Sequence, residues 1–175
     1  MTDSEQVMEW AKTQGAVVCN DPKERQRLLD YIVPVAAVFP DLVKQVNATY
    51  VYRMEEQKKK AAGADGMLWK DVAGKKGTLY AIGISVEAMD GGPEYAAFVF
   101  MHELAHMVTD VSHTSAFHEK LSEMIATYNQ TTGTNIVNDF YAWPSRFDSR
   151  PYILPDNIRV EPGCKSTSFR TEAKE

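Results

Sequence analysis

Residues 101–119 read MHELAHMVTDVSHTSAFHE, and they carry the strongest pattern in the chain. This stretch contains all four histidines of the protein, which are His102, His106, His113 and His118. The first two frame the motif His-Glu-Leu-Ala-His, and residues four apart lie on one face of an α-helix, about one turn from each other. Both imidazoles can therefore direct a ring nitrogen at one metal ion. Glu103 is rotated off that axis, and in this motif it reaches the water that the metal holds.

A catalytic zinc site needs a third protein ligand, because zinc prefers tetrahedral geometry and keeps one position for water. We expect His113 to be that ligand. The sequence Val-Ser-His-Thr at residues 111–114 is β-branched and rich in hydroxyls, which predicts that the first helix ends here and that Thr114 caps a second one. The second helix is expected at residues 115–128, with an apolar stripe formed by Phe117, Leu121, Met124, Ile125 and Tyr128.

Several neighbouring side chains leave alternatives open. The other candidate third ligands are His118, Asp110, Glu119 and Glu123. His118 is equally a candidate hydrogen-bond donor to a ligand or a surface residue. Asp110 lies one turn beyond His106 and is expected to orient an imidazole or to end the helix in solvent. If His118 joined the other three histidines, the shell would be closed to water and the site would be structural.

The start of the first helix is also marked. Gly-Gly-Pro-Glu at residues 91–94 places proline at the first helical position and an acid in the first turn. A stripe facing away from the histidines is expected to be buried, and it consists of Ala97, Met101, Leu104, Ala105 and Val108.

The sequence around these histidines resembles the core of the WLM-type and SprT-like zinc metalloproteases, which include small stand-alone versions encoded by large DNA viruses. The likeness consists of HELAH, six further residues, and then HTSAFHEKL at residues 113–121. The preceding LYAIGISV at residues 79–86 resembles the strand before the active helix in such enzymes. The resemblance covers about residues 79–128, and the loop before the third histidine lacks the Gly-Pro or Gly-His that these families often have.

This resemblance implies a zinc peptidase in which Glu103 is the general base and the zinc ligands are His102, His106 and His113. Some relatives act on proteins attached to DNA. The metzincin pattern fits less well, because Thr109 and Ser112 stand where that pattern needs a glycine and a histidine. A thermolysin-like arrangement takes its third ligand from a glutamate on a later helix, and Glu119 and Glu123 are close in sequence for that geometry.

The expected fold class is α+β, a small zincin-like domain in which a short, mostly antiparallel sheet packs on the HExxH helix and on flanking helices. A helix is expected to begin at Asp21-Pro22 and to end or kink at Pro34, with a shorter one at residues 41–46. Strands are expected at residues 48–54, 67–69 and 79–88. The chain of 175 residues is expected to form a single domain over residues 1–175, with a frayed tail at 165–175.

Composition sets further bounds. A net charge of -5 argues against a dedicated nucleic-acid binder, which needs clustered lysine and arginine. Lysines at residues 58–60 and 75–76 form a candidate basic loop for DNA or an acidic substrate, although a solvated loop is the simpler interpretation. Cys19 and Cys164 are expected to be free thiols, and their pairing stays open. No signal peptide or membrane span is visible, so an intracellular location is expected, and the viral resemblance adds virion association.

The predicted function is zinc-dependent hydrolysis of peptide bonds in a protein or peptide substrate, with Glu103 transferring the proton of water to the leaving amine. The oxyanion donor is sought among late residues, and Tyr152 is preferred over Tyr141, Arg146 and Arg150. An extended peptide is expected to add to the sheet near Ser85 and Glu87. The alternative is a non-catalytic, zinc-stabilised binding protein or virion component. An effector protease delivered to other cells also stays open, as does the oligomeric state.

Overall fold

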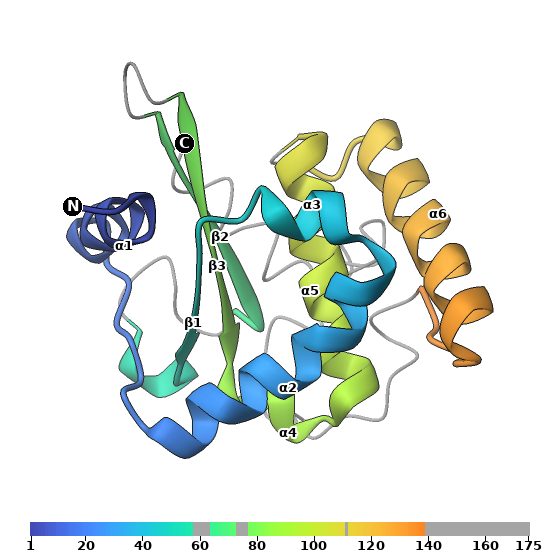
Figure 1. Cartoon of the computed structure of the whole chain (residues 1–175), viewed down its shortest axis with the longest axis horizontal. Coiled ribbons are helices and arrows are strands. Elements are labelled where there is room, and N and C mark those ends of the chain that lie inside the picture. Colours follow the sequence, from blue (N-terminus) through green and yellow to red (C-terminus); the bar gives the residue numbers. More distant parts are fainter. Residues whose placement is uncertain (58–63, 73–76, 111, 139–175) are drawn as a thin grey trace, which may run out of the picture.

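The computed structural model describes residues 1–57, 64–72, 77–110 and 112–138. The basic segments at 58–60 and 75–76 and the expected tail at 165–175 lie outside these ranges. The described residues form an α+β structure of helices around one three-stranded sheet (Figure 1). The elements are α1 (Asp3–Thr13), α2 (Pro22–Val38), α3 (Pro40–Lys44), β1 (Ala48–Tyr52), the 3₁₀ helix η1 (Met54–Glu56), β2 (Gly66–Val72), β3 (Thr78–Ser85), α4 (Val86–Asp90), α5 (Pro93–Val108) and α6 (Ser115–Thr132).

The sheet has the strand order β1-β3-β2 and is mixed, whereas a mostly antiparallel sheet was expected. β2 pairs antiparallel to β3, with Leu68 opposite Ile82. β1 pairs parallel to β3, with Val51 opposite Ile84. Parallel strands need a long crossover, and residues 53–77, which include β2, are long enough to provide one. β3 is therefore the central strand, and β1 and β2 are its neighbours.

β3 ends earlier than the expected residue 88, because the helix α4 begins directly after it. β3 ends at Ser85, whose hydroxyl accepts a hydrogen bond of 2.9 Å from the backbone N–H of Ala88 and so caps α4. The expectation that a peptide adds beside Ser85 and Glu87 is wrong, since Ser85 lies on the central strand opposite Tyr52 and Glu87 lies in α4. β2 is in turn longer than the expected 67–69.

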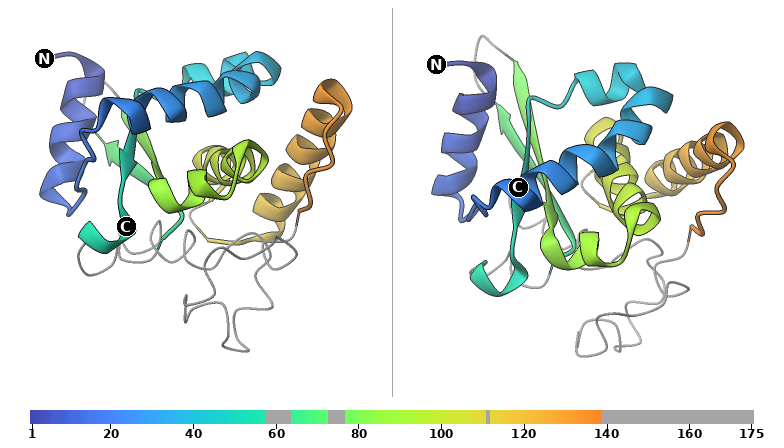
Figure 2. Two further views of the ribbon diagram at one scale, coloured as in Figure 1. Left: turned by 90° about the horizontal axis from the view of Figure 1, so that it is seen from below. Right: turned by 60° about the horizontal axis from the view of Figure 1, so that its bottom comes forward.

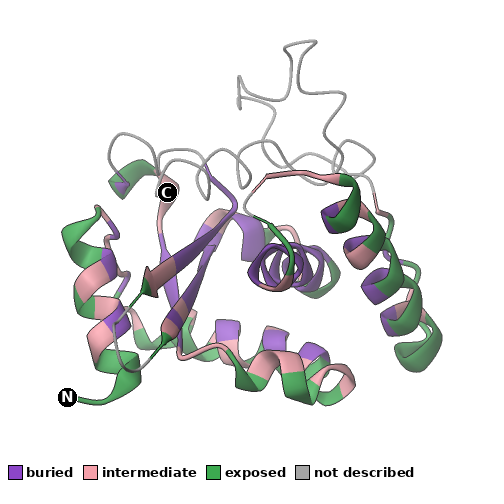
Figure 3. Cartoon of the chain, turned by 90° about the horizontal axis from the view of Figure 1, so that it is seen from above, coloured by how far each residue is buried: buried purple, intermediate pink, exposed green. Residues whose placement is uncertain are grey.

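α5, which carries the HExxH motif, is buried on every side instead of along one stripe. All residues from Tyr95 to Met107 are buried. This follows from its position, because α5 packs against β2 and β3 on one side and against α2 and α6 on the others (Figures 1 and 3). Its start at Pro93 follows Gly92, whose φ of 105° suits glycine. The two motif histidines are thereby placed in the interior of the protein.

α6 forms as expected. Thr114 caps it by accepting a hydrogen bond of 3.2 Å from the backbone N–H of Phe117, and the helix continues past the expected end at Tyr128 to Thr132. Its buried residues are the predicted stripe of Phe117, Leu121, Met124, Ile125 and Tyr128. The opposite side of α6 is exposed (Figure 3). This helix therefore closes the α5 layer against solvent.

α2 begins where expected, with the Asp21 side chain accepting a hydrogen bond of 2.9 Å from the backbone N–H of Lys23. It does not end at Pro34 but continues to Val38. A proline inside a helix removes one backbone hydrogen bond. The burial of Leu28 and Val35 in the core offsets that loss.

α1 was not expected from the sequence, and it covers the face of the sheet opposite α5 (Figures 1 and 2). It is held by a capping box in which the hydroxyl of Thr2 accepts from the backbone N–H of Glu5 and the carboxylate of Glu5 accepts from the backbone N–H of Thr2. Val7 and Ala11 are its buried residues. Within the described part of the chain, no helix is both long enough and apolar enough to cross a membrane.

Candidate metal centre

The structure brings His102, His106 and His113 together into one cluster. The Nε2 atom of His102 lies 3.2 Å from Nε2 of His106 and 3.3 Å from Nε2 of His113. One ring nitrogen from each residue falls within 4.8 Å of the others. The first two side chains are buried and the third is partly buried.

The spacing of the His102 nitrogen from the nitrogens of His106 and His113 fits a small tetrahedral ion. Two nitrogens bound tetrahedrally at 2.0–2.1 Å from zinc are about 3.3 Å apart, which is close to both short distances in the cluster. Three imidazoles with no thiolate and no carboxylate among them are a donor set that suits zinc. The cluster therefore fits the group that the motif implies.

Two elements and one short loop position the ligands. His102 and His106 lie one turn apart on α5, and His113 lies in the loop between α5 and α6. The loop is held on both sides of His113, because the backbone N–H of Thr114 donates to the carbonyl of Ser112 at 2.9 Å while the Thr114 hydroxyl caps α6. The third histidine is thus fixed by the cap of the next helix.

The orientation of His106 is fixed by Asp110, as the sequence suggested, but through the backbone. Nδ1 of His106 lies 2.6 Å from the carbonyl oxygen of Asp110. A carbonyl only accepts hydrogen bonds, so Nδ1 carries the proton and Nε2 is left with its lone pair facing the cluster. The Asp110 carboxylate instead accepts from the backbone N–H of Ser112 at 3.3 Å.

Burial keeps the motif histidines neutral. It lowers the pKa of His102 well below its usual value, and the neighbouring imidazoles lower it further. Burial also lowers the pKa of His106 to about 4, against a smaller opposing effect of the Asp110 carbonyl. A metal binds the neutral imidazole, so both side chains are in the binding form at neutral pH.

Glu103 is the most unusual side chain of the cluster. It is completely buried, and neither carboxylate oxygen has a hydrogen-bond partner among the residues that the structure describes. Burial raises the pKa of its carboxyl well above the usual value, and the charge of Asp65 raises it further. A buried carboxyl without a partner is costly, so natural proteins rarely keep one without a function.

Gly66 lets β2 approach this carboxylate. A Cβ atom at position 66 would lie 2.7 Å from Cγ1 of Val99 and 3.2 Å from Oε2 of Glu103. The first residue of β2 therefore lies directly against Glu103. This contact connects the sheet to the HExxH motif.

Asp65 is a site residue that sequence reasoning missed. It is completely buried, and its Oδ2 accepts a hydrogen bond of 2.7 Å from the hydroxyl of Tyr95 in α5. Its backbone carbonyl accepts from the N–H of Ser85 at 2.9 Å. An aspartate just before a strand is usually a turn residue, so the sequence carries no signal that distinguishes this one.

The other candidate ligands lie outside the cluster. The His118 ring is tilted against that of His113 at 5.8 Å between centroids, and His118 does not belong to the group of candidate ligands. Glu119 and Glu123 are exposed on α6. The late residues considered as oxyanion donors or as a disulfide partner lie outside the described residues, and these are Tyr141, Arg146, Arg150, Tyr152 and Cys164. Cys19 is buried and forms no disulfide with a described residue.

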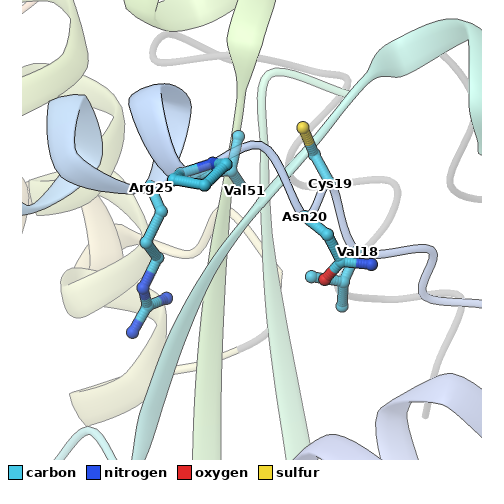
Figure 4. A pocket seen from close by; sticks show the side chains of 6 residues that line it. Val18, Cys19, Asn20, Arg25 and Val51 are labelled. Atoms are coloured by element: carbon cyan, nitrogen blue, oxygen red, sulfur yellow. The ribbon is translucent and has the colours of Figure 1, made fainter.

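A pocket of about 280 Å³ lies elsewhere, beside β1 (Figure 4). Its lining includes Cys19, Arg25 and Val51. The Cys19 thiol and the Arg25 guanidinium point away from each other, so the polar groups do not converge on a ligand. The backbone N–H of Cys19 donates to the carbonyl of Val51 at 2.7 Å, which makes this region part of the packing at the sheet edge.

No known protein family, curated protein or solved structure matches this chain. The interpretation of the centre therefore depends on its own geometry and on the motif.

Proposed function

We propose that this protein is a zinc-dependent metallopeptidase of zincin-like architecture, related to the WLM-type and SprT-like enzymes that its motif resembles. The observation that supports this most strongly is the combination of three converging imidazoles with an adjacent buried carboxyl that has no hydrogen-bond partner within residues 1–57, 64–72, 77–110 and 112–138. A metal site that served only stability would gain nothing from such a carboxyl. A carboxyl that is not hydrogen-bonded within the protein is available to bind and release a proton of the water or the substrate.

His102, His106 and His113 would hold the zinc. When bound, zinc supplies a Lewis acid that lowers the pKa of water and polarises a carbonyl. Glu103 takes a proton from the attacking water and returns it to the leaving amine, which suits its raised pKa, since a higher pKa makes a carboxylate a stronger base. The carbonyl of Asp110 keeps His106 in the tautomer that leaves Nε2 available.

The substrate is proposed to be an extended peptide segment that adds to β2. Among the strands that the structure describes, β2 lies at the edge of the order β1-β3-β2, and its first residue lies against Glu103. An edge strand presents unpaired backbone groups that an extended chain can pair with. A peptide on β2 would pass the carboxylate, whereas one near Ser85, on the central strand, would not.

The alternative of a purely structural zinc site has less support. It requires a fourth protein ligand, and within the described ranges the cluster contains three histidines without His118. It also leaves the buried carboxyl of Glu103 unexplained.

The test compares the wild type with Glu103→Gln and with Glu123→Gln, a matched change at an exposed glutamate on α6. Zinc content is measured by atomic emission, and turnover is measured on dye-labelled casein, both unfolded and crosslinked to DNA. We expect all three proteins to retain zinc and only Glu103→Gln to lose turnover. A wild type without zinc, or full turnover in Glu103→Gln, would refute the proposal.

A further inference from the structure

The ring of Phe117 contacts all three histidines of the centre. It stacks on His106 with 4.1 Å between centroids and 21° between planes. It meets His102 edge-on at 4.9 Å and 68°, and His113 in a tilted arrangement at 4.8 Å and 41°. The three imidazoles therefore share one aromatic neighbour.

Phe117 is itself firmly held. It is completely buried in the first turn of α6. Its backbone N–H donates to the hydroxyl of Thr114, the residue that follows His113. The capping hydrogen bond therefore ties the third histidine and the aromatic ring into one rigid unit.

An aromatic ring suits this position for two reasons. It offers no hydrogen-bond donor or acceptor, so it cannot compete with a metal for the imidazole nitrogens. Its flat face and its edge also favour particular stacked and edge-on arrangements, which restrict the rotation of each imidazole. An aliphatic side chain fills a similar volume without imposing these angles.

We propose that Phe117 is a positioning residue for the metal centre, because its ring is the common surface that sets the relative orientation of the three imidazoles. The inference depends on the metal binding proposed above. Side chains that are already oriented lose less conformational entropy when they bind, so loss of the ring is expected to weaken metal binding. This role is separate from the contribution that any buried phenylalanine makes to stability.

Phe98 provides the matched control. It is also completely buried and lies on α5, but its ring is 6.4 Å from that of His102, farther than any of the Phe117 distances. Phe117→Leu and Phe98→Leu therefore make the same chemical change at two buried positions. Both are expected to destabilise the metal-free protein, and they differ in what they do to the imidazoles.

The experiment uses the full chain and measures three quantities for each protein. These are urea stability without metal, zinc affinity by chelator competition, and the visible absorption spectrum of the cobalt(II) form. We expect Phe117→Leu to lower zinc affinity by about tenfold or more, the size of effect usual for residues that orient metal ligands, and to shift the cobalt bands. Phe98→Leu is expected to retain the wild-type spectrum and to lower zinc affinity much less than Phe117→Leu, since its ring lies farther from His102 than the ring of Phe117 does.

Equal effects of the two variants on affinity and spectrum would overturn the inference and leave Phe117 as an ordinary core residue. If Phe117→Leu does not fold, Phe117→Met, which keeps an apolar side chain of similar volume, takes its place with the same expected outcome. A wild type that binds neither zinc nor cobalt would instead refute the proposed function. The two failures are therefore distinguishable.

Discussion

The two faces of the sheet differ in whether the buried polar groups described below have hydrogen-bond partners. On the face covered by α1, the buried polar groups pair with each other. The indole N–H of Trp69 donates to the hydroxyl of Tyr50, and the hydroxyl of Tyr52 donates to the carbonyl of Ala64 at 2.5 Å. On the face covered by α5, Glu103 is just as deeply buried, yet both of its carboxylate oxygens lack a hydrogen-bond partner in the described part of the chain.

This difference indicates that the α1 face contributes mainly to stability and that the α5 face carries the candidate site. A buried polar group that is satisfied within the protein adds modestly to stability, whereas an unsatisfied one costs free energy. The α1 face is therefore organised as a core, with Val7 and Ala11 sealing it. On the α5 face, a buried carboxyl that lowers stability lies beside three imidazoles. This is expected of a site whose polar groups interact with a bound ligand.

The largest effect is expected from removing the histidine that lies nearest to both others. His102→Ala should lower zinc affinity by more than about 100-fold, since even residues that only orient ligands contribute 10- to 100-fold. His118→Ala is the matched control and should keep zinc binding. Chelator competition measures both. Loss of zinc in His118→Ala but not in His113→Ala would show that the ligand set is wrong.

Two glycines, one on each face, sharpen the comparison. A Cβ at Gly83 would lie 2.4 Å from Cζ of Tyr50, and one at Gly66 would lie 2.7 Å from Cγ1 of Val99 and 3.2 Å from Oε2 of Glu103. Gly83→Ala is expected to cost about 3 kcal/mol of unfolding free energy because a rigid ring must move. Gly66→Ala should cost less, since Val99 and Glu103 can shift, but should reduce turnover.

Urea unfolding and turnover per folded molecule separate the two glycine variants. Gly83→Ala is expected to lose more unfolding free energy than Gly66→Ala but to keep its turnover. Gly66→Ala is expected to lose less unfolding free energy and to have reduced turnover. If Gly83→Ala loses turnover as strongly as Gly66→Ala, the α1 face is not independent of the site.

The pH dependence of stability distinguishes Glu103 from the polar groups of the α1 face. Its pKa is raised in the folded protein, so the stability that the neutral carboxyl provides is present below the usual value of 4.5 and is lost as pH rises through the folded pKa. An amide stays neutral throughout. Metal-free Glu103→Gln should therefore match the wild type near pH 4 and exceed its unfolding free energy by about 2 kcal/mol at neutral pH.

Denaturant titrations between about pH 4 and pH 8 check this expectation in the metal-free protein. Zinc should reduce the advantage of the amide, because a nearby cation stabilises the carboxylate. A wild type that is as stable as Glu103→Gln at neutral pH would mean that the carboxyl is not as isolated as the structure shows.

The sequence predicted the elements that carry strong local signals. Asp21-Pro22, Gly92-Pro93 and Thr114 start α2, α5 and α6, because capping chemistry is a local property. The capping box of Thr2 and Glu5 is an equally local signal, and it would have revealed α1. The i, i+4 spacing likewise brings His102 and His106 together.

Other features depend on tertiary structure and had no local signal. The parallel pairing of β1 with β3 joins residues that are far apart in the sequence, such as Val51 and Ile84, and no strand sequence alone indicates it. The closeness of Asp65 to Glu103 arises only when β2 packs on α5. α5 is buried on all sides, so its apolar residues are not confined to one face of the helix. The period of its apolar residues therefore could not indicate which face of α5 carries the site.

The smallest expected effect belongs to the α1 face. Tyr52→Phe removes the donor to the carbonyl of Ala64 and should lower the unfolding free energy by about 1 kcal/mol, the usual net value of one hydrogen bond. Zinc affinity and the cobalt spectrum should not change, because the hydroxyl lies on the opposite side of the sheet from the histidines. Urea unfolding together with chelator competition measures both. A weakened metal site in Tyr52→Phe would show that the two faces are energetically coupled through the sheet, and the separation of a stabilising face from a functional face would then fail.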